Sequence, residues 1–192
     1  MEDGSVLTIG VVSAALLSEA EVEQRIAEAL KSAHLLGAAG KYQHRKYGEM
    51  PIRVLRRIVG DYQLTEMDMP SGGLGIPEEY RDASDRADAR KCWRFAANLT
   101  ETLAQHLAAT YAGLGEEAEI PTPHDARERG KDVLFYCPQG WYFPPSSRLR
   151  ISLESHGLQL PSDGWIIPDR LTKERGEKES INQTVLKAIQ QL

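Results

Sequence analysis

The fold prediction rests on the stretch PEEYRDASDRADARKCWRFAANLTETLAQHLAATYA, residues 77–112, which carries the strongest helical signal in the chain. Apolar residues recur along it at three- and four-residue intervals, as expected for one face of a helix. That face consists of Cys92, Trp93, Ala96, Leu99, Leu103, Leu107 and Tyr111. A helix over most of this stretch measures about 45 Å at 1.5 Å per residue. The stretch therefore predicts the spine of an elongated helical bundle.

The N-terminal segment adds one strand and one helix. Residues 5–12, SVLTIGVV, are rich in β-branched residues and predict a short strand, although no partner strand is evident nearby. Ser18 and Glu21 have the spacing of a capping box, in which side chain and backbone exchange hydrogen bonds at a helix start. We expect this helix to continue to about Leu36, before Gly37 and Gly40.

The C-terminal segment has a different character. Residues 116–132 are acidic and contain proline, which indicates a linker between an N-terminal part (1–115) and an α-rich C-terminal part (133–192). Within the latter, residues 133–137 are interpreted as a short strand, and helices are expected after Ser146 and from Ser180. The fold prediction is a mainly α protein, an elongated helical bundle with minor β structure.

Composition narrows the class of protein. The chain has 192 residues, of which 41% are hydrophobic, enough for a substantial core. The longest uncharged apolar run near the N-terminus is too short to span a bilayer and has no basic residue before it. Cys92 and Cys137 lie 45 positions apart, which indicates neither a disulfide framework nor a metal cage. We expect a soluble, cytoplasmic protein with no membrane partner.

Signatures of catalysis are missing from the sequence. The five histidines are scattered without metal-ligand spacing, and the glycine-rich stretch 67–77 lacks the GKS or GKT of a phosphate-binding loop. Cys92 and Cys137 lie among apolar residues, where thiols are usually inert. Because no set combines a nucleophile, a base and an electrophile, we predict a protein that is not an enzyme and has no metal or cofactor.

The leading functional segment is KYQHRKYGEMPIRVLRR, residues 41–57, with six Lys or Arg against Glu49 in a chain of formal charge -5. Such local contrast is typical of a groove that follows a phosphate backbone. Pro51 fits the first turn of a helix, whose outer face would carry the arginines that follow. The candidate nucleic-acid contacts are Lys41, Arg45, Lys46, Arg53, Arg56 and Arg57, with Tyr42 and Tyr47 as candidate stacking residues. The alternative is a solvated cationic face without a ligand.

A second basic feature lies in the first half of the predicted spine. Arg86, Arg90 and Arg94 recur every four residues, so their guanidinium groups would project in one row. These three are the second-choice nucleic-acid contacts. Asp82, Asp85 and Asp88 are available as helical neighbours, and simple surface ion pairs are the alternative explanation.

Residues 7–41 resemble a known family. LTIGVV, followed by a capped helix that ends in ALKSAHLLGAAGK, resembles the last strand and helix of the GGDEF-like palm found in CRISPR large subunits. The GGDD or GGDEF metal-binding signature is missing here. In that family a helical bundle similar to the Cascade small subunit follows the palm, and some small subunits are internal translation products of the large-subunit gene.

The resemblance implies a role in antiviral defence. The chain would be a non-catalytic subunit of a CRISPR effector, Cascade-like ribonucleoprotein complex, and its basic face would stabilise DNA strands of the R-loop. Its partners would be DNA, bound as single strands without sequence preference, and the other protein subunits of the complex. Two alternatives stay open: a winged-helix-like duplex-DNA-binding protein of a plasmid or phage, and a purely structural protein-interaction adaptor.

Overall fold

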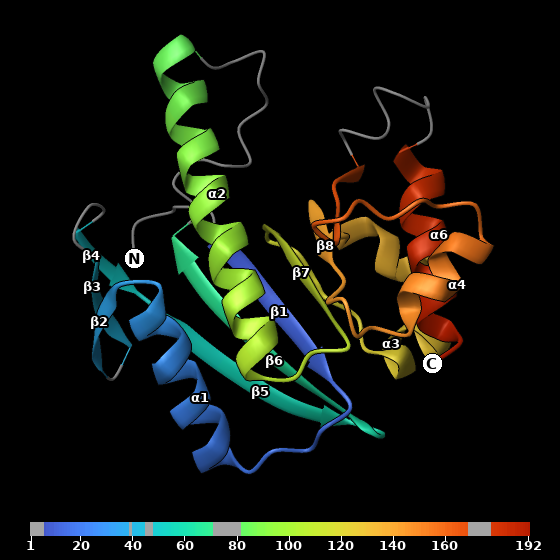
Figure 1. Ribbon diagram of the computed structural model, residues 1–192, viewed down its shortest axis with the longest axis horizontal. Helices are drawn as coiled ribbons and strands as arrows, with labels where there is room; N and C mark the ends of the chain where they lie inside the picture. Colours follow the sequence, from blue (N-terminus) through green and yellow to red (C-terminus); the bar gives the residue numbers. More distant parts are fainter. Residues whose placement is uncertain (1–5, 39, 45–47, 71–81, 169–177) are drawn as a thin grey trace.

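An antiparallel sheet, and not a helical bundle, organises the protein (Figure 1). The structure, a computed structural model, describes residues 6–38, 40–44, 48–70, 82–168 and 178–192. The strands are β1 (Val6–Ser13), β2 (Leu35–Ala38), β3 (Lys41–His44), β4 (Gly48–Pro51), β5 (Arg53–Val59), β6 (Tyr62–Pro70), β7 (Tyr111–Glu116), β8 (Gly140–Tyr142) and β9 (Trp165–Ile166). The helices are α1 (Glu19–Ser32), α2 (Ala83–His106), α3 (Pro123–Arg129), the 3-10 helix η2 (Gly130–Tyr136), α4 (Leu149–Ser155) and α6 (Lys178–Gln190). The prediction of a mainly α fold is therefore wrong: the fold is mixed α/β.

The main sheet has six strands in the order β5-β6-β1-β7-β8-β9, and every neighbouring pair is antiparallel. Its first four strands and the two longest helices follow one another as β1-α1-β5-β6-α2-β7, the split βαβ arrangement also called ferredoxin-like. A second sheet, β2-β3-β4, is inserted between α1 and β5. Helices α1 and α2 cover one face of the main sheet, as Figure 1 shows.

The predicted N-terminal strand is present as β1, and it lies at the centre of the sheet. Residues from Leu7 to Ser13 are all buried, because helices cover one face and the C-terminal elements approach the other. Its partners, β6 and β7, are distant in sequence, and so no neighbouring segment revealed them. A strand covered on both faces reads as a continuous apolar run, which explains the composition LTIGVV.

Helix α1 begins where the sequence predicts. Ser18 caps it with the full capping box to Glu21, and the backbone N–H of Ser18 donates to the Glu21 carboxylate at 2.9 Å. These bonds lower the pKa of Glu21. The helix ends at Ser32, earlier than predicted, because His34 adopts a left-handed conformation (φ 61°) and the chain continues as β2.

The segment after Pro51 was predicted as a helix and is the strand β5. Its apolar residues are spaced in a way that also fits a helical stripe, but β5 pairs with β6 over seven consecutive residues. Gly60 and Asp61 form the connecting turn, and Gly60 has a positive φ (59°) that favours glycine at the first turn position of a two-residue hairpin. The tight turn therefore favours the hairpin over the helix.

Helix α2 confirms the helical stretch but is shorter than predicted. It ends at His106, where Ala108 takes a positive φ (51°) and the N–H of Ala109 donates to the carbonyl of Ala104 at 2.8 Å. Tyr111, expected on the helix, starts β7, and it is fully buried in the second core. With 24 residues, α2 is about 36 Å long and its first half projects beyond the sheet (Figure 1).

The C-terminal elements extend the same sheet. β8 pairs with β7 and β9 pairs with β8, while α3, α4 and α6 pack with η2 around a second core against the other face. The predicted linker, residues 116–132, contains the end of β7 and all of α3, which starts with a capping box at Thr122. Residues 133–137, interpreted as a strand, belong mostly to η2.

Candidate nucleic-acid interface

The arginines of β5 lie on two faces of the sheet. Side chains of a strand alternate between faces, so Arg53 and Arg57 share one face and Arg56 lies on the other. The expectation that all three share the outer face of a helix is therefore wrong. Side chains alternate every two residues on a strand but repeat every 3.6 residues on a helix, so Arg53, Arg56 and Arg57 would share a face only on a helix.

Arg57 binds an acid from the C-terminal half. Its Nη2 lies 3.2 Å from Oδ2 of Asp125, whose side chain is only 12% exposed. The same carboxylate accepts hydrogen bonds from the N–H (3.0 Å) and the hydroxyl (2.8 Å) of Thr122. Burial by itself would raise the pKa of Asp125, but the Thr122 hydrogen bonds and the Arg57 charge outweigh it, and the pKa is lowered. Arg57 therefore holds the start of α3 against the sheet.

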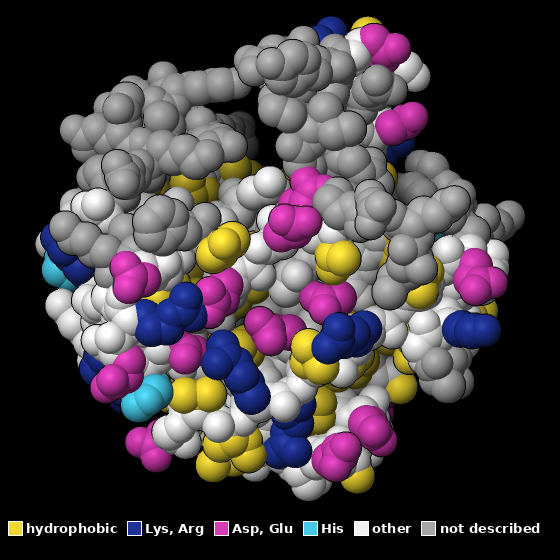
Figure 2. All heavy atoms as spheres, turned by 180° about the vertical axis from the view of Figure 1, so that it is seen from behind, with side chains coloured by type: hydrophobic (Ala, Val, Ile, Leu, Met, Phe, Trp, Pro, Cys, Tyr) yellow, Lys and Arg dark blue, Asp and Glu magenta, His cyan; other side chains and the backbone are white. Residues whose placement is uncertain are grey.

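Acidic side chains lie between the arginines of this face. Asp68 is the register partner of Arg53 and accepts a hydrogen bond from the hydroxyl of Thr8 at 2.9 Å. Glu66, on the same face, is half-buried, and burial raises its pKa in spite of the nearby Arg57. Figure 2, a view of this side of the molecule, shows Lys or Arg side chains interspersed with Asp or Glu. The face is a surface of mixed charge.

Arg56 is used in the fold on the opposite face. Its guanidinium donates to the carbonyl of Leu17 and to Oε1 of Gln63 at 3.4 Å. The same Gln63 oxygen accepts the N–H of Leu17 at 3.0 Å. These bonds fix the loop before α1 to the sheet, so this guanidinium stabilises the chain's own backbone.

Two further residues of the basic segment, Lys41 and Tyr42, lie on β3 of the small sheet. Lys41 is exposed on β3. Tyr42, its neighbour, is half-buried and packs against the core under α1 and α2, which leaves only part of its ring for stacking. Arg45, Lys46 and Tyr47 lie outside the described residues.

Arg86, Arg90 and Arg94 belong to a single helix, α2, as predicted. Arg90 and Arg94 are exposed, and Arg94 Nε donates to the carbonyl of Arg90 at 3.3 Å. Neither makes an ion pair with any residue in the described part of the chain. Asp88, two residues before Arg90, is paired with Lys91 at 2.7 Å. Arg86, at the start of the row, is half-buried.

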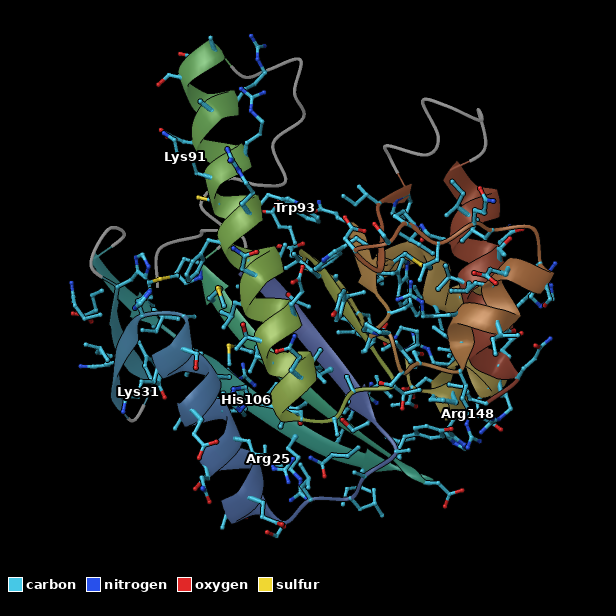
Figure 3. All side chains as sticks on the ribbon, in the orientation of Figure 1. Arg25, Lys31, Lys91, Trp93, His106 and Arg148 are labelled. Carbon is cyan, nitrogen blue, oxygen red and sulfur yellow. The ribbon has the colours of Figure 1, made fainter. Side chains whose placement is uncertain are left out.

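Trp93 anchors this part of α2 to the body. Its ring meets Trp165 of β9 edge to face, with centroids 6.2 Å apart. A Cβ on Gly140 of β8 would lie 2.9 Å from the Trp93 ring, so only glycine permits this approach. Trp165 is itself held by a hydrogen bond from Nε1 to the Glu101 carboxylate at 2.7 Å. In Figure 3 Trp93 points toward the C-terminal elements, whereas Lys91 lies on the other side of α2.

Sequence reasoning placed Trp93 on the apolar face of the helix but missed its partners. Positions 93, 140 and 165 are far apart in the chain, and only the pairing of β7, β8 and β9 brings them together. A glycine before three aromatic residues, Gly140 before Trp141 to Phe143, gave no local signal of this contact.

A small polar pocket lies where α1 meets the end of α2. It has a volume of about 360 Å³ and is lined by Glu21, Gln24, Arg25, Glu28 and His106. Arg25 donates to the carbonyl of His106 at 2.9 Å, and His106 Nδ1 lies 3.7 Å from the Glu28 carboxylate (Figure 3). Arg25 of α1 therefore satisfies a backbone carbonyl at the end of α2, and this hydrogen bond joins the two helices beside the pocket.

The thiol of Cys137 is half-buried, and its Sγ donates to the carbonyl of Val133 at 3.7 Å. Burial raises the pKa of Cys137 to about 11, so its thiol stays protonated at neutral pH. Across the described ranges, no group of three or more His, Cys, Asp or Glu side chains is arranged to hold a metal ion. Exposed cations such as Lys41, Arg90 and Arg94 can bind an anionic ligand through charge.

Comparison of the chain with family models, with curated proteins and with solved structures gave no match. Of the helices that the structure describes, none has the length and apolar composition that crossing a bilayer requires.

Proposed function

We propose that the protein binds nucleic acid without catalysis, by laying the row Arg86, Arg90 and Arg94 along a phosphate backbone. The observation that supports this is the exposure of Arg90 and Arg94 on the first half of α2, without a carboxylate partner in the described residues. Residues four apart advance about 6 Å along a helix, so the row covers about 12 Å of one side of α2.

Charge and chemistry favour a polyanion as the ligand. Residues 83–94 carry four Lys or Arg against two Asp in a chain of formal charge -5. Arginine presents a planar set of donors that matches phosphate oxygens, and each contact releases condensed counterions. No set of side chains reads base edges in this proposal, so the contacts position the strand without selecting its sequence.

The row now ranks above the segment 41–57 as the contact surface. Arg56 and Arg57 bind groups of the chain itself, and Arg53 lies opposite Asp68. Lys41 is exposed and remains a candidate, together with Arg45, Lys46 and Tyr47 outside the described residues. The proposal does not depend on the resemblance to a CRISPR small subunit, because the helical bundle that the resemblance implies is replaced by a sheet.

The proposal is tested by fluorescence anisotropy with a labelled ~30-nucleotide single strand and with its duplex, at several salt concentrations. We expect single-strand binding that is steep in salt and independent of sequence. Arg90→Gln with Arg94→Gln should weaken it for every sequence. The matched control is Arg148→Gln with Lys187→Gln, which removes two exposed cations from the C-terminal elements and should leave affinity unchanged.

Three results would contradict the proposal. Equal losses in the two double variants would show an effect of net charge alone. A preference for duplex DNA would favour the winged-helix-like alternative. The structure gives that alternative no support from β8 and β9, because both strands belong to the main sheet. Absence of binding at every salt concentration would favour the structural adaptor.

A further inference from the structure

Among the described residues, no strand pairs with the outer edge of β5, and this edge of the main sheet is regular. β5 is the end strand of the described sheet and pairs with β6 without a bulge over all seven residues. Proteins usually protect such edges with proline, charged side chains, bulges or very short strands. β5 contains no proline, and two of its three arginines are turned to groups of the chain itself, Arg56 to the Leu17 carbonyl and Gln63 and Arg57 to Asp125.

The hairpin determines which backbone groups point outward. Val59 and Tyr62 flank a two-residue turn and exchange hydrogen bonds, so Arg57, Leu55 and Arg53 also face β6 in the alternating antiparallel pattern. The N–H and C=O groups of Val54, Arg56 and Ile58 then point away from the sheet. This is the pattern that an added strand requires.

Exposed apolar side chains lie along the same edge. Val54 is 39% exposed, Leu55 40% and Ile58 53%. Leu16 is also exposed, and the bonds of Leu17 to Gln63 and Arg56 bring it to this side of the hairpin. Four of the large apolar side chains that are exposed in the described chain therefore gather around one strand.

We propose that β5 binds an extended segment of a partner protein as an added antiparallel strand, with acidic residues opposite its arginines and β-branched residues opposite Val54, Leu55 and Ile58. Opposite charges across a strand pair stabilise it, and like charges destabilise it. Arg53 is the first anchor, because it makes no hydrogen bond or ion pair with another described residue.

The same charges argue against a second copy of this chain as the occupant. In a two-fold antiparallel pairing centred on residue 55, Arg53 lies opposite Arg57 of the other copy. When the pairing is centred on residue 56, Arg56 lies opposite Arg56 of the other copy. When it is centred on residue 57, Arg57 lies opposite Arg57 of the other copy. Every central register thus places arginine against arginine.

The test uses a fluorescein-labelled peptide, Thr-Val-Glu-Glu-Val-Val-Glu-Thr, whose inner six residues complement Ile58 to Arg53 in antiparallel order. One control peptide has Lys in place of Glu, and another has every backbone nitrogen methylated. We expect the full chain to bind the acidic peptide at least tenfold more tightly than either control. Ile58→Pro should reduce this affinity at least tenfold, because it removes an outward N–H that the fold does not use.

Two further variants separate the contributions. Ile58→Ala keeps the N–H and should weaken binding less than Ile58→Pro, while Arg53→Gln should reduce the preference for the acidic peptide over the lysine peptide. Circular dichroism confirms that each variant is folded. The proposal is overturned if neither peptide binds, if the methylated peptide binds equally well, or if Ile58→Pro has no effect. It is also overturned if light scattering shows a dimer that Ile58→Pro dissociates, since the occupant is then a second copy.

Discussion

The arginines of β5 and those of α2 are closely spaced in the sequence in both cases, but their surroundings in the structure differ. On β5, Arg56 and Arg57 bind the Leu17 carbonyl and the Asp125 carboxylate, and both contacts join distant segments of the fold. On α2, Arg90 and Arg94 are exposed on a projecting helix. A dense run of cations in a sequence therefore predicts a binding surface only when the period of the local structure keeps them together and no acid of the fold reaches them.

The largest effect is expected where α2 is attached. Trp93→Ala should lower the free energy of unfolding by about 2 kcal/mol, less than for a fully buried tryptophan, because the ring is only partly buried against Trp165 and Gly140. Urea denaturation measures it. Lys91→Ala, on the same turn and paired only at the surface, is the control and should change stability by less than about 0.5 kcal/mol. A Trp93→Ala protein as stable as the wild type would show that α2 needs no such anchor.

The second effect concerns the β5 arginines. Asp125→Asn should cost about 1 kcal/mol at pH 7, because the amide keeps one acceptor oxygen but loses the negative charge that strengthens the hydrogen bonds to Thr122 and Arg57. Since the folded-state pKa of Asp125 is lowered, its stabilisation is present above the unfolded pKa of about 3.9 and is lost as the pH falls through the folded value. Urea midpoints of the two proteins should therefore converge in acid. A difference that is constant from pH 7 to pH 2 would contradict this role.

Much of the local structure could be predicted from the sequence. The capping box at Ser18 and the apolar spacing of α2 depend on residues a few positions apart, so the existence of α1 and α2 was predicted, although each helix ends earlier than expected. The sheet depends on pairs such as Gly10 with Glu66 and Gly10 with Gly113, more than fifty residues apart, which no local pattern reports.

The candidate site divides in the same way. Arg86, Arg90 and Arg94 form a row because of helical spacing, and this was predicted. The separation of Arg56 from Arg53 and Arg57 was not, because the apolar residues after Pro51 fit a helical stripe as well as a strand. The anchor at Trp93 depends on tertiary pairing alone.

A smaller effect of opposite sign is expected at Glu66. Burial raises its folded-state pKa, so the stabilisation that it gives is full below the unfolded pKa of about 4.3 and is lost as the pH rises through the folded value. Glu66→Gln should therefore increase the free energy of unfolding at pH 7, by less than about 1 kcal/mol because the side chain is partly in water. Thermal denaturation measures this as a higher midpoint. The gain should vanish near pH 3. A loss of stability at pH 7 would show that Glu66 is held mainly by Arg57.

The smallest effect on stability is expected in the α2 row. Arg90→Gln with Arg94→Gln should change the free energy of unfolding by less than about 0.5 kcal/mol, because neither guanidinium has an ion-pair partner in the described chain. Urea denaturation at low salt concentration is the most sensitive measurement of this change. A loss above about 1 kcal/mol would place these arginines among the residues that hold the fold.

The most direct test compares single-strand affinity across salt concentrations for two variants with equal charge loss, Arg53→Gln with Arg57→Gln and Arg90→Gln with Arg94→Gln. We predict that the α2 variant loses affinity and flattens the salt slope by about 1.4 units, at about 0.7 per phosphate contact, whereas the β5 variant loses stability but keeps the wild-type slope. A flattened slope in the β5 variant, with an unchanged slope in the α2 variant, would contradict the account and return the binding surface to the strand.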